Sequence, residues 1–167
     1  MPELDVRPIS PEAFAPYGQL IQATSEGARP INAGSSLRTD LAQQLQLTGS
    51  QGQPTLAVFR ASGRSLTGPW TVMERHQLGS QSFIGMDGVR SVVLVALGEH
   101  KPDPDTLAAF LVQGAVGYTL APGTWHHPLI ALEDGDFVVI ERGADTVDCE
   151  VVSLDAPVFL RHDSMQS

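Results

Sequence analysis

The sequence contains a single cysteine, Cys149, so no disulfide can form within the chain, as is usual in a reducing compartment. Positive charge is also scarce. Ten lysines and arginines stand against nineteen aspartates and glutamates, which gives a net charge of −9. A protein that binds nucleic acid neutralises phosphates with a basic face, so this composition argues against a nucleic-acid partner.

Long apolar runs are absent as well. The longest, VVLVAL at residues 92–97, is far shorter than the roughly 20 residues that a helix needs to span a bilayer. The first ten residues, MPELDVRPIS, are acidic and contain prolines, unlike a secretory signal peptide. These absences predict a cytoplasmic protein with no membrane partner. A small anionic ligand stays possible if a few arginines converge.

Short β-rich segments make up much of the chain. Val, Ile and Phe are frequent in five of them, namely 55–60, 71–76, 91–97, 137–142 and 149–154. The gaps between them are mostly too short for the helices that a parallel α/β sheet requires. A length of 167 residues suits one domain, predicted to span 1–167. The fold class predicted is mainly all-β: a double-stranded β-barrel or jelly roll with a few short helices.

Three segments are candidates for helix. Residues 10–16 open with Ser, Pro and Glu, which is favourable chemistry for a helix start, and a second proline should end the turn. Leucines recur every four residues in 37–45, which predicts a short amphipathic helix. Residues 105–114 fit either a helix or a strand.

Histidine is scarce, with five in the chain, yet two are adjacent in PGTWHHP at residues 122–128. Gly123 would form a turn that enters a strand. Successive side chains of a strand point to opposite faces, so His126 would face a pocket and His127 the other side. Metal binding, acid/base chemistry and plain packing all account for such a histidine.

A second group of this kind ends the β-rich segment 71–76. By the same alternation Glu74 and His76 share one face, and Arg75 points to the other as an ion-pair or interface residue. Burying an unpaired charge is costly, so such a pair inside a barrel would be paired, liganded or functional. The alternative is a solvated strand end.

These residues resemble the two motifs of the cupin superfamily. The first motif is matched in spacing by Gly68, Glu74, His76, Gln81 and Gly88, and the second by Gly123 and His126. Glutamate and glutamine replace a histidine and a glutamate of the first motif, and Pro122 lies one place from the expected proline. The resemblance implies a cupin-like barrel with a metal at Glu74, His76, Gln81 and His126.

A fuller resemblance is to the ureidoglycolate lyases, also called ureidoglycolate hydrolases. It is carried in order by INAGSSLR (31–38), VFRA (58–61), MERHQLGSQSF (73–83), VLVALGEHKPD (93–103), PGTWHHPL (122–129) and FVVIERG (137–143). The resemblance implies a cupin-like homodimer that eliminates urea from ureidoglycolate to give glyoxylate in allantoin (purine) degradation. It favours nickel as a divalent metal, with metal-free catalysis as the alternative.

The chain departs from this family at four places. Gln77 and Gly85 stand where the family commonly has proline. Thr119 and Leu120 stand where it often has Asn-Tyr. Loss of an amide and a phenol would remove hydrogen bonds to a substrate. Two alternative functions therefore stay open. One is another cupin enzyme acting on a small hydroxy or sugar acid, and the other is a non-catalytic barrel that binds a small molecule.

The lyase reaction needs a base for a hydroxyl proton and an acid for the leaving nitrogen, and the substrate carboxylate needs a cation. We expect Glu74 and His126 to share the proton transfers, with His76 holding their geometry or a metal. We expect Ser80 and Gln81 to bind the ureido group. Arg38 or Arg60 would bind the carboxylate, and Lys101 is a weaker candidate for the same role. Trp125 would be a stacking platform for the substrate unless it lies in the core.

Overall fold

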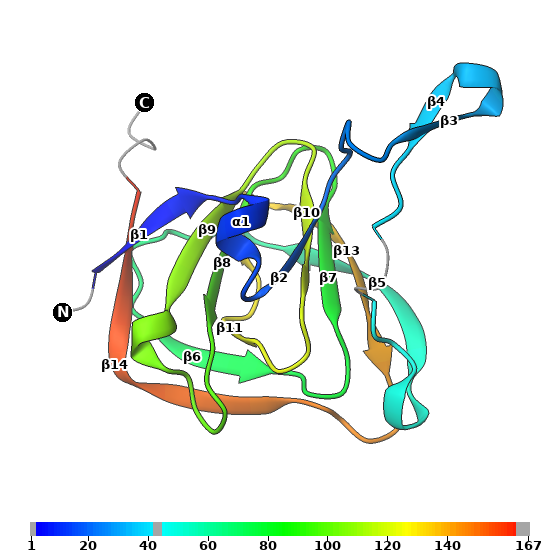
Figure 1. Cartoon of the computed structure of the whole chain (residues 1–167). Coiled ribbons are helices and arrows are strands. Elements are labelled where there is room, and N and C mark those ends of the chain that lie inside the picture. The colour runs from blue at the N-terminus through cyan, green and yellow to red at the C-terminus, as the bar shows by residue number, and fades with distance from the viewer. Residues whose placement is uncertain (1–2, 42–44, 163–167) are drawn as a thin grey trace.

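The structure is a computed structural model that describes residues 3–41 and 45–162. Strands form almost all of its regular structure, arranged as a barrel with one projecting hairpin (Figure 1). The larger sheet has the order β11-β6-β14-β1-β9-β8-β12, and β11 also pairs with β8. These strands are β1 (Glu3–Pro8), β6 (Trp70–Arg75), β8 (Ser91–Ala96), β9 (Ala108–Val112), β11 (Trp125–His126), β12 (Ile130–Ala131) and β14 (Glu150–Arg161).

The second sheet has five strands in the order β2-β10-β7-β13-β5. They are β2 (Gly18–Ile21), β5 (Gln53–Ala61), β7 (Gln81–Gly85), β10 (Gly117–Leu120) and β13 (Gly135–Gly143). All five β-rich segments of the sequence fall on strands, namely β5, β6, β8, β13 and β14. The prediction of a mainly β barrel with a few short helices is confirmed.

The strand β8 shows why such apolar runs form. Its side chains alternate between two core clusters: Val93 and Val95 pack in one, and Val92 and Leu94 pack in the other. All six of its residues are buried. A strand covered on both faces reads as a continuous apolar run, which is what VVLVAL is.

The predicted helices had different outcomes. The helix α1 (Pro11–Phe14) has Ser10 as its N-cap, whose hydroxyl accepts from the Ala13 amide, as predicted. Segment 105–114 divides into the 3₁₀ turn η3 (Pro104–Thr106) and β9. Within the part of the chain that the structure describes, no helix is long and apolar enough to cross a membrane.

The prediction of a helix over 37–45 is wrong for the residues of this segment that the structure describes. Leu37 lies in β4 (Ser36–Arg38), which pairs with β3 (Arg29–Ile31) across the turn η1 (Asn32–Gly34), and residues 42–44 lie outside the described part. Leu37 and Leu45 are both exposed, so no apolar helix face exists there. The hairpin β3–β4 extends away from the barrel instead (Figure 1). A further turn, η2 (Gly49–Gln51), leads into β5.

Candidate active site

The site is built where the short strand β11 pairs with the end of β6. His126 lies directly opposite Glu74 in this antiparallel pair, and opposite Val95 on the other side of β11. Side chains of directly opposed residues share a face. Nε2 of His126 therefore lies 3.4 Å from Oε1 of Glu74, and the ring of His76 lies with its centroid 5.3 Å from that of His126.

The turn before β11 follows from its sequence. The amide of Thr124 donates to the Ala121 carbonyl across Pro122 and Gly123, and Gly123 has a φ of +84°. Proline followed by a residue with positive φ is typical of a type II turn, in which glycine is favoured at that position. The Gly123 amide also donates to the His76 carbonyl at 2.7 Å, so the turn joins the two halves of the site.

Backbone carbonyls set the tautomers of the two site histidines. Nδ1 of His126 lies 3.1 Å from the Thr124 carbonyl, and Nδ1 of His76 lies 2.6 Å from the Asp148 carbonyl. A carbonyl oxygen only accepts hydrogen bonds, so Nδ1 carries the proton in both neutral rings. Each Nε2 then presents a lone pair. Both Nε2 atoms are buried and have no hydrogen-bond partner among the residues that the structure describes.

Three hydrogen-bond acceptor atoms therefore lie close together with no hydrogen atom between them. One oxygen of Glu74 and one nitrogen each of His76 and His126 all lie within 4.8 Å of one another. The pKa of Glu74 is held below its usual value, chiefly by its polar contact with His126 and against the effect of burial. Three lone pairs that face one another are stable only with a proton or a cation among them. This donor set fits a divalent transition metal.

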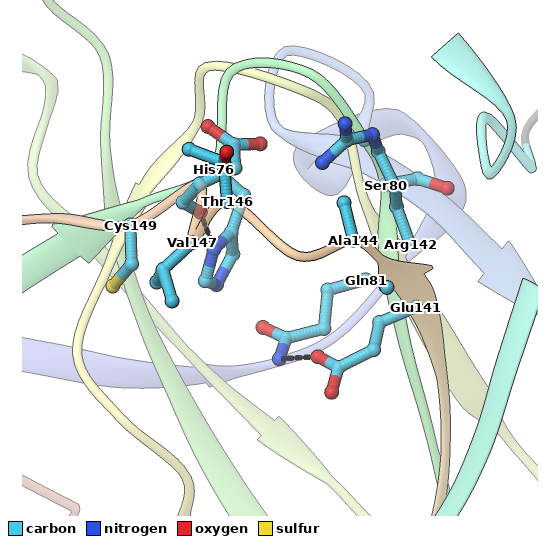
Figure 2. Close-up of a pocket in the computed structure, with 12 residues that line it drawn as sticks. His76, Ser80, Gln81, Glu141, Arg142, Ala144, Thr146, Val147 and Cys149 are labelled. Carbon is cyan, nitrogen blue, oxygen red and sulfur yellow. Dashed lines mark hydrogen bonds between the residues drawn. The ribbon is translucent and has the colours of Figure 1, made fainter. Parts of the chain in front are cut away.

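Gln81 and Glu141 face the same place from the five-stranded sheet. They are opposite one another in the β7–β13 pair, and the Gln81 amide nitrogen donates to Glu141 at 2.7 Å (Figure 2). Because the amide nitrogen makes this bond, the amide oxygen of Gln81 points away from Glu141, and it is buried without a partner among the described residues. Gln81 thus offers one more unused oxygen acceptor to the site.

The site opens into two hollows. One is lined by His76, Ser80, Gln81, Glu141, Arg142, Asp148 and Cys149, among others (Figure 2). The other is lined by Phe59, Arg60, Arg64, Glu74, Gln81, Phe83 and Leu129, among others. Gln81 lines both, so the cluster of Glu74, His76 and His126 lies where the two hollows approach each other.

Cys149 and Glu141 are site residues that the sequence reasoning missed. The Cys149 thiol donates to the second oxygen of Glu74 at 3.7 Å, and burial followed by the Glu74 charge raises its pKa. Its place beside β6 depends on remote pairing, which no local pattern shows. Glu141 could have been found from the sequence, because alternation along the strand places it on the same face as the buried Phe137 and Val139.

Other predicted residues lie at various distances from this cluster. The Ser80 hydroxyl lines the first hollow and accepts from the Gln46 amide at 2.8 Å. Arg60 lines the second hollow, where it pairs with both oxygens of Asp136. Arg38 lies on the projecting hairpin and bonds to Asp40. Lys101 pairs with Asp155 on the surface.

Trp125 and Arg75 lie on the face of the sheet away from the site. Trp125 is fully buried, donates from its indole nitrogen to the Gly98 carbonyl, and presents no face to a ligand. The Arg75 guanidinium lies 4.3 Å from the Trp125 ring and pairs with Glu150. His127 also points away and packs against Trp70. The alternation predicted for both strands is what separates these residues from the site.

Two of the four positions that depart from the family, Thr119 and Leu120, lie on opposite faces of β10. Leu120 is opposite Gln81 and packs in the barrel core beside it. Thr119 is opposite Ser82, and their hydroxyls hydrogen-bond at 2.8 Å on the other face. Of the two, only Leu120 shares a face with the site residue Gln81.

The fold and the site define a class: a β-barrel protein in which a carboxylate and two imidazoles meet. Comparison with known proteins is more specific. The family model described as "Ureidoglycolate lyase" matches residues 1–161. The chain belongs to the ureidoglycolate lyase family.

Named relatives cover nearly the whole chain. A ureidoglycolate lyase of Burkholderia cepacia is 40% identical over 159 residues, which is 92% of this chain and 88% of that one. One of Burkholderia mallei (strain NCTC 10229) is 34% identical over 166 residues, covering 99% and 97%. One of Escherichia coli O1:K1 / APEC is 38% identical over 155 residues, covering 91% and 94%.

A solved structure also overlaps in part. It is a dTDP sugar isomerase from Desulfovibrio desulfuricans G20, 21% identical, with a TM-score of 0.42 and coverage of 78% of this chain and 87% of that one.

Proposed function

We propose that this chain eliminates urea from ureidoglycolate to leave glyoxylate, as a step of allantoin (purine) degradation. The observation that carries the proposal is the meeting of the Glu74 carboxylate with the unpartnered Nε2 atoms of His76 and His126. It occurs in a chain that belongs to the ureidoglycolate lyase family over residues 1–161.

The reaction is a proton transfer coupled to bond cleavage. One carbon of ureidoglycolate carries a hydroxyl, a ureido nitrogen and a carboxylate. The hydroxyl loses its proton as the carbonyl of glyoxylate forms. The carbon–nitrogen bond breaks, its electron pair leaves with urea, and that nitrogen takes up a proton. The net change moves one proton from oxygen to nitrogen, so a single group that accepts and returns a proton serves both halves.

Nε2 of His126 suits this role in a metal-free site. It is an acceptor because Nδ1 holds its proton toward Thr124, and the Glu74 carboxylate 3.4 Å away stabilises the imidazolium that forms. The imidazolium then returns the proton to the leaving nitrogen. Cys149 donates to the other oxygen of Glu74 and so keeps Oε1 directed at His126.

A divalent metal fits the same cluster, where Glu74, His76 and His126 would hold it and Gln81 offers a further oxygen. Bound there, it would supply Lewis-acid polarisation of a substrate oxygen. His126 would then be a ligand, and the carboxylate of Glu141, which lines the same hollow, would accept the hydroxyl proton. Nickel stays the identity that the family resemblance implies.

Two further residues suit the ureido group. The amide oxygen of Gln81 is buried without a partner and is placed to accept from a ureido N–H. The Ser80 hydroxyl accepts from the backbone of Gln46, and its own proton is free to be donated to the ureido oxygen. The homodimer, the single domain and the cytoplasmic location stay predictions from the sequence.

The test is urea and glyoxylate release from ureidoglycolate by the purified protein, with the uncatalysed decay subtracted. Equal amounts of both products without extra ammonia are expected. The assay is run on protein as isolated, after chelation, and after return of nickel or manganese. Loss on chelation with recovery on metal return assigns Glu74, His76 and His126 as ligands, whereas unchanged turnover assigns His126 as the base.

A matched pair of surface variants controls for unrelated effects. Glu99 and His100 are adjacent and exposed, and their side chains pair with each other at 4.0 Å. Glu99→Gln and His100→Ala should leave turnover unchanged, whereas Glu74→Gln and His126→Ala should lower it by about a hundredfold or more in folded protein. Absence of turnover by the wild type would favour another small hydroxy or sugar acid, with Leu120 beside Gln81 as the first position to exchange.

A further inference from the structure

The pair formed by Gln81 and Glu141 has a hydrogen-bonding polarity that the protein itself fixes. The two residues are opposite one another on β7 and β13, and the Gln81 amide nitrogen donates to Glu141 at 2.7 Å (Figure 2). A carboxylate accepts hydrogen bonds and does not donate them, so the amide must offer its NH2 group to Glu141. Glu141 therefore determines that the oxygen end of the Gln81 amide faces the rest of the site.

This oxygen has no partner among the described residues. Gln81 is only 6% exposed, and its amide oxygen is buried without a hydrogen bond. Its neighbour across the other side of β7 is Leu120 of β10, whose side chain has no donor to offer. Buried acceptors are nearly always satisfied, and Gln81 lines both hollows. The oxygen therefore indicates a ligand that donates a hydrogen bond.

The groups around the amide oxygen are mainly acceptors as well. Nε2 of His76, Nε2 of His126 and one oxygen of Glu74 already lie close together. The first hollow adds the carboxylates of Glu141 and Asp148. A ligand end that supplies several N–H groups matches such surroundings. A ligand end made of methyl groups or further acceptors does not, because it leaves the buried acceptors unsatisfied.

The ureido group is the donor-rich end of the proposed substrate. It carries one N–H on the nitrogen that leaves with urea and an NH2 group at its far end. The leaving nitrogen must lie at the cluster of Glu74, His76 and His126, because it takes up a proton there. The terminal NH2 group lies one carbon further along, so it is the part that can reach the oxygen of Gln81 while the reacting carbon stays at the cluster.

A metal bound at the cluster leaves this role to Gln81. Catalytic metal sites commonly have three protein ligands, and Glu74, His76 and His126 supply three. A neutral amide oxygen is a weaker ligand for a transition metal than a carboxylate or an imidazole. The Gln81 oxygen is therefore the donor of the four that the substrate can use.

We propose that Glu141 is a positioning residue for substrate selection: by fixing the amide of Gln81, it makes the site select a ligand whose far end is an NH2 group. Gln81 contacts that group, and Glu141 acts through Gln81. The inference rests on the proposed lyase function and names its specificity device, which accepts a ureido end and rejects an acyl end of the same shape.

Two inert analogues isolate this contact. N-carbamoylglycine is ureidoglycolate without its hydroxyl, so it cannot undergo the elimination. N-acetylglycine has the same shape, charge and inner N–H, but a methyl group replaces the terminal NH2. Wild type should bind N-carbamoylglycine about tenfold more tightly, because the methyl group leaves the Gln81 oxygen unsatisfied. Both dissociation constants are measured by calorimetry on the protein as isolated.

Glu141→Lys tests the positioning role directly. A lysine side chain only donates, so its hydrogen bond to Gln81 requires the amide oxygen, and the NH2 end of the amide turns toward the site. The ratio of the two affinities should then fall to about one or below, and Gln81→Leu should likewise give about equal affinities. If Glu141 served only the fold or only as a base, both affinities would change alike or kcat alone would fall. An unchanged ratio in Glu141→Lys would overturn the proposal.

The matched control is Gln77→Leu. The Gln77 amide nitrogen also donates to a carboxylate, that of Glu150 at 2.6 Å, but Gln77 is exposed and is not among the described residues that line the two hollows. This variant should keep the wild-type preference. If Glu141→Lys does not fold, the exchange Gln81→Glu with Glu141→Gln takes its place. The amide then donates from β13 and a carboxylate oxygen faces the site, so the preference should persist, and its loss would refute the inference.

Binding of the analogues separates this inference from the lyase assignment. Neither analogue is turned over, so the ratio of their affinities is defined whether or not the protein releases urea. Turnover of ureidoglycolate together with equal affinities in the wild type would overturn the inference and leave the lyase standing. A preference that depends on Glu141, in a protein without ureidoglycolate turnover, would leave the selection of a terminal NH2 group standing and refute the lyase.

Discussion

Replacement of Glu74 by glutamine gives the most direct test of the site. The carboxylate lies 3.4 Å from Nε2 of His126, and its side chain is only 21% exposed. At an effective dielectric constant of about 20, a carboxylate and an imidazolium at this distance attract by about 5 kcal/mol. Partial exposure and salt reduce this to about 3 kcal/mol, which corresponds to roughly a hundredfold in rate.

The expected result is a kcat lower by about a hundredfold or more, measured as glyoxylate released by folded Glu74→Gln protein. Bound metal is measured on the same samples. Loss of metal together with activity, both recovered in excess metal, would identify Glu74 as a ligand rather than as the partner of an imidazolium. A kcat within about threefold of that of Glu99→Gln would refute the reasoning, because no electrostatic role of the size calculated would then exist.

Two further predictions concern stability. Arg75→Met should lower the free energy of unfolding by about 2–4 kcal/mol in denaturant titrations and leave kcat unchanged. The reason is that Arg75 packs on Trp125 away from the site and donates to the Glu99 carbonyl. An unaltered midpoint of the denaturant titration would contradict this. The lowered pKa of Glu74 stabilises the fold fully above its unfolded value of 4.5, and this contribution is lost as pH falls through the folded value. Wild type should therefore lose stability with acidification more steeply than Glu74→Gln, and parallel curves would show that the contact is not stabilising.

The strands were predictable wherever their sequence is locally distinctive. Segment 91–97 is an apolar run because β8 is buried on both faces, and segment 137–142 contains the buried Phe137 and Val139. The strand β1 was not predicted. It is parallel to both β9 and β14, so its partners come from remote parts of the chain and its own sequence is mostly exposed. A local pattern carries no information about such pairing.

The failure over 37–45 has a related cause. Leucine spacing indicates a helix only if the leucines share a buried face. Leu37 instead lies in a hairpin opposite Pro30, where it is exposed, so nothing in the described part of the chain buries it.

The catalytic cluster was predictable for a different reason. Alternation along two strands places Glu74 with His76 and separates His126 from His127, and Gly123 predicted the turn that enters β11. What alternation does not supply is the distance between strands. The β6–β11 register, which makes Glu74 and His126 direct neighbours, is a property of the closed barrel.

The acceptor atoms of the catalytic cluster are oriented by the backbone. Thr124 and Asp148 hold the tautomers of His126 and His76 through backbone carbonyls, so the acceptor atoms are oriented before any substrate arrives. Such preorganisation requires a rigid frame, and β11 is held between β6 and β8.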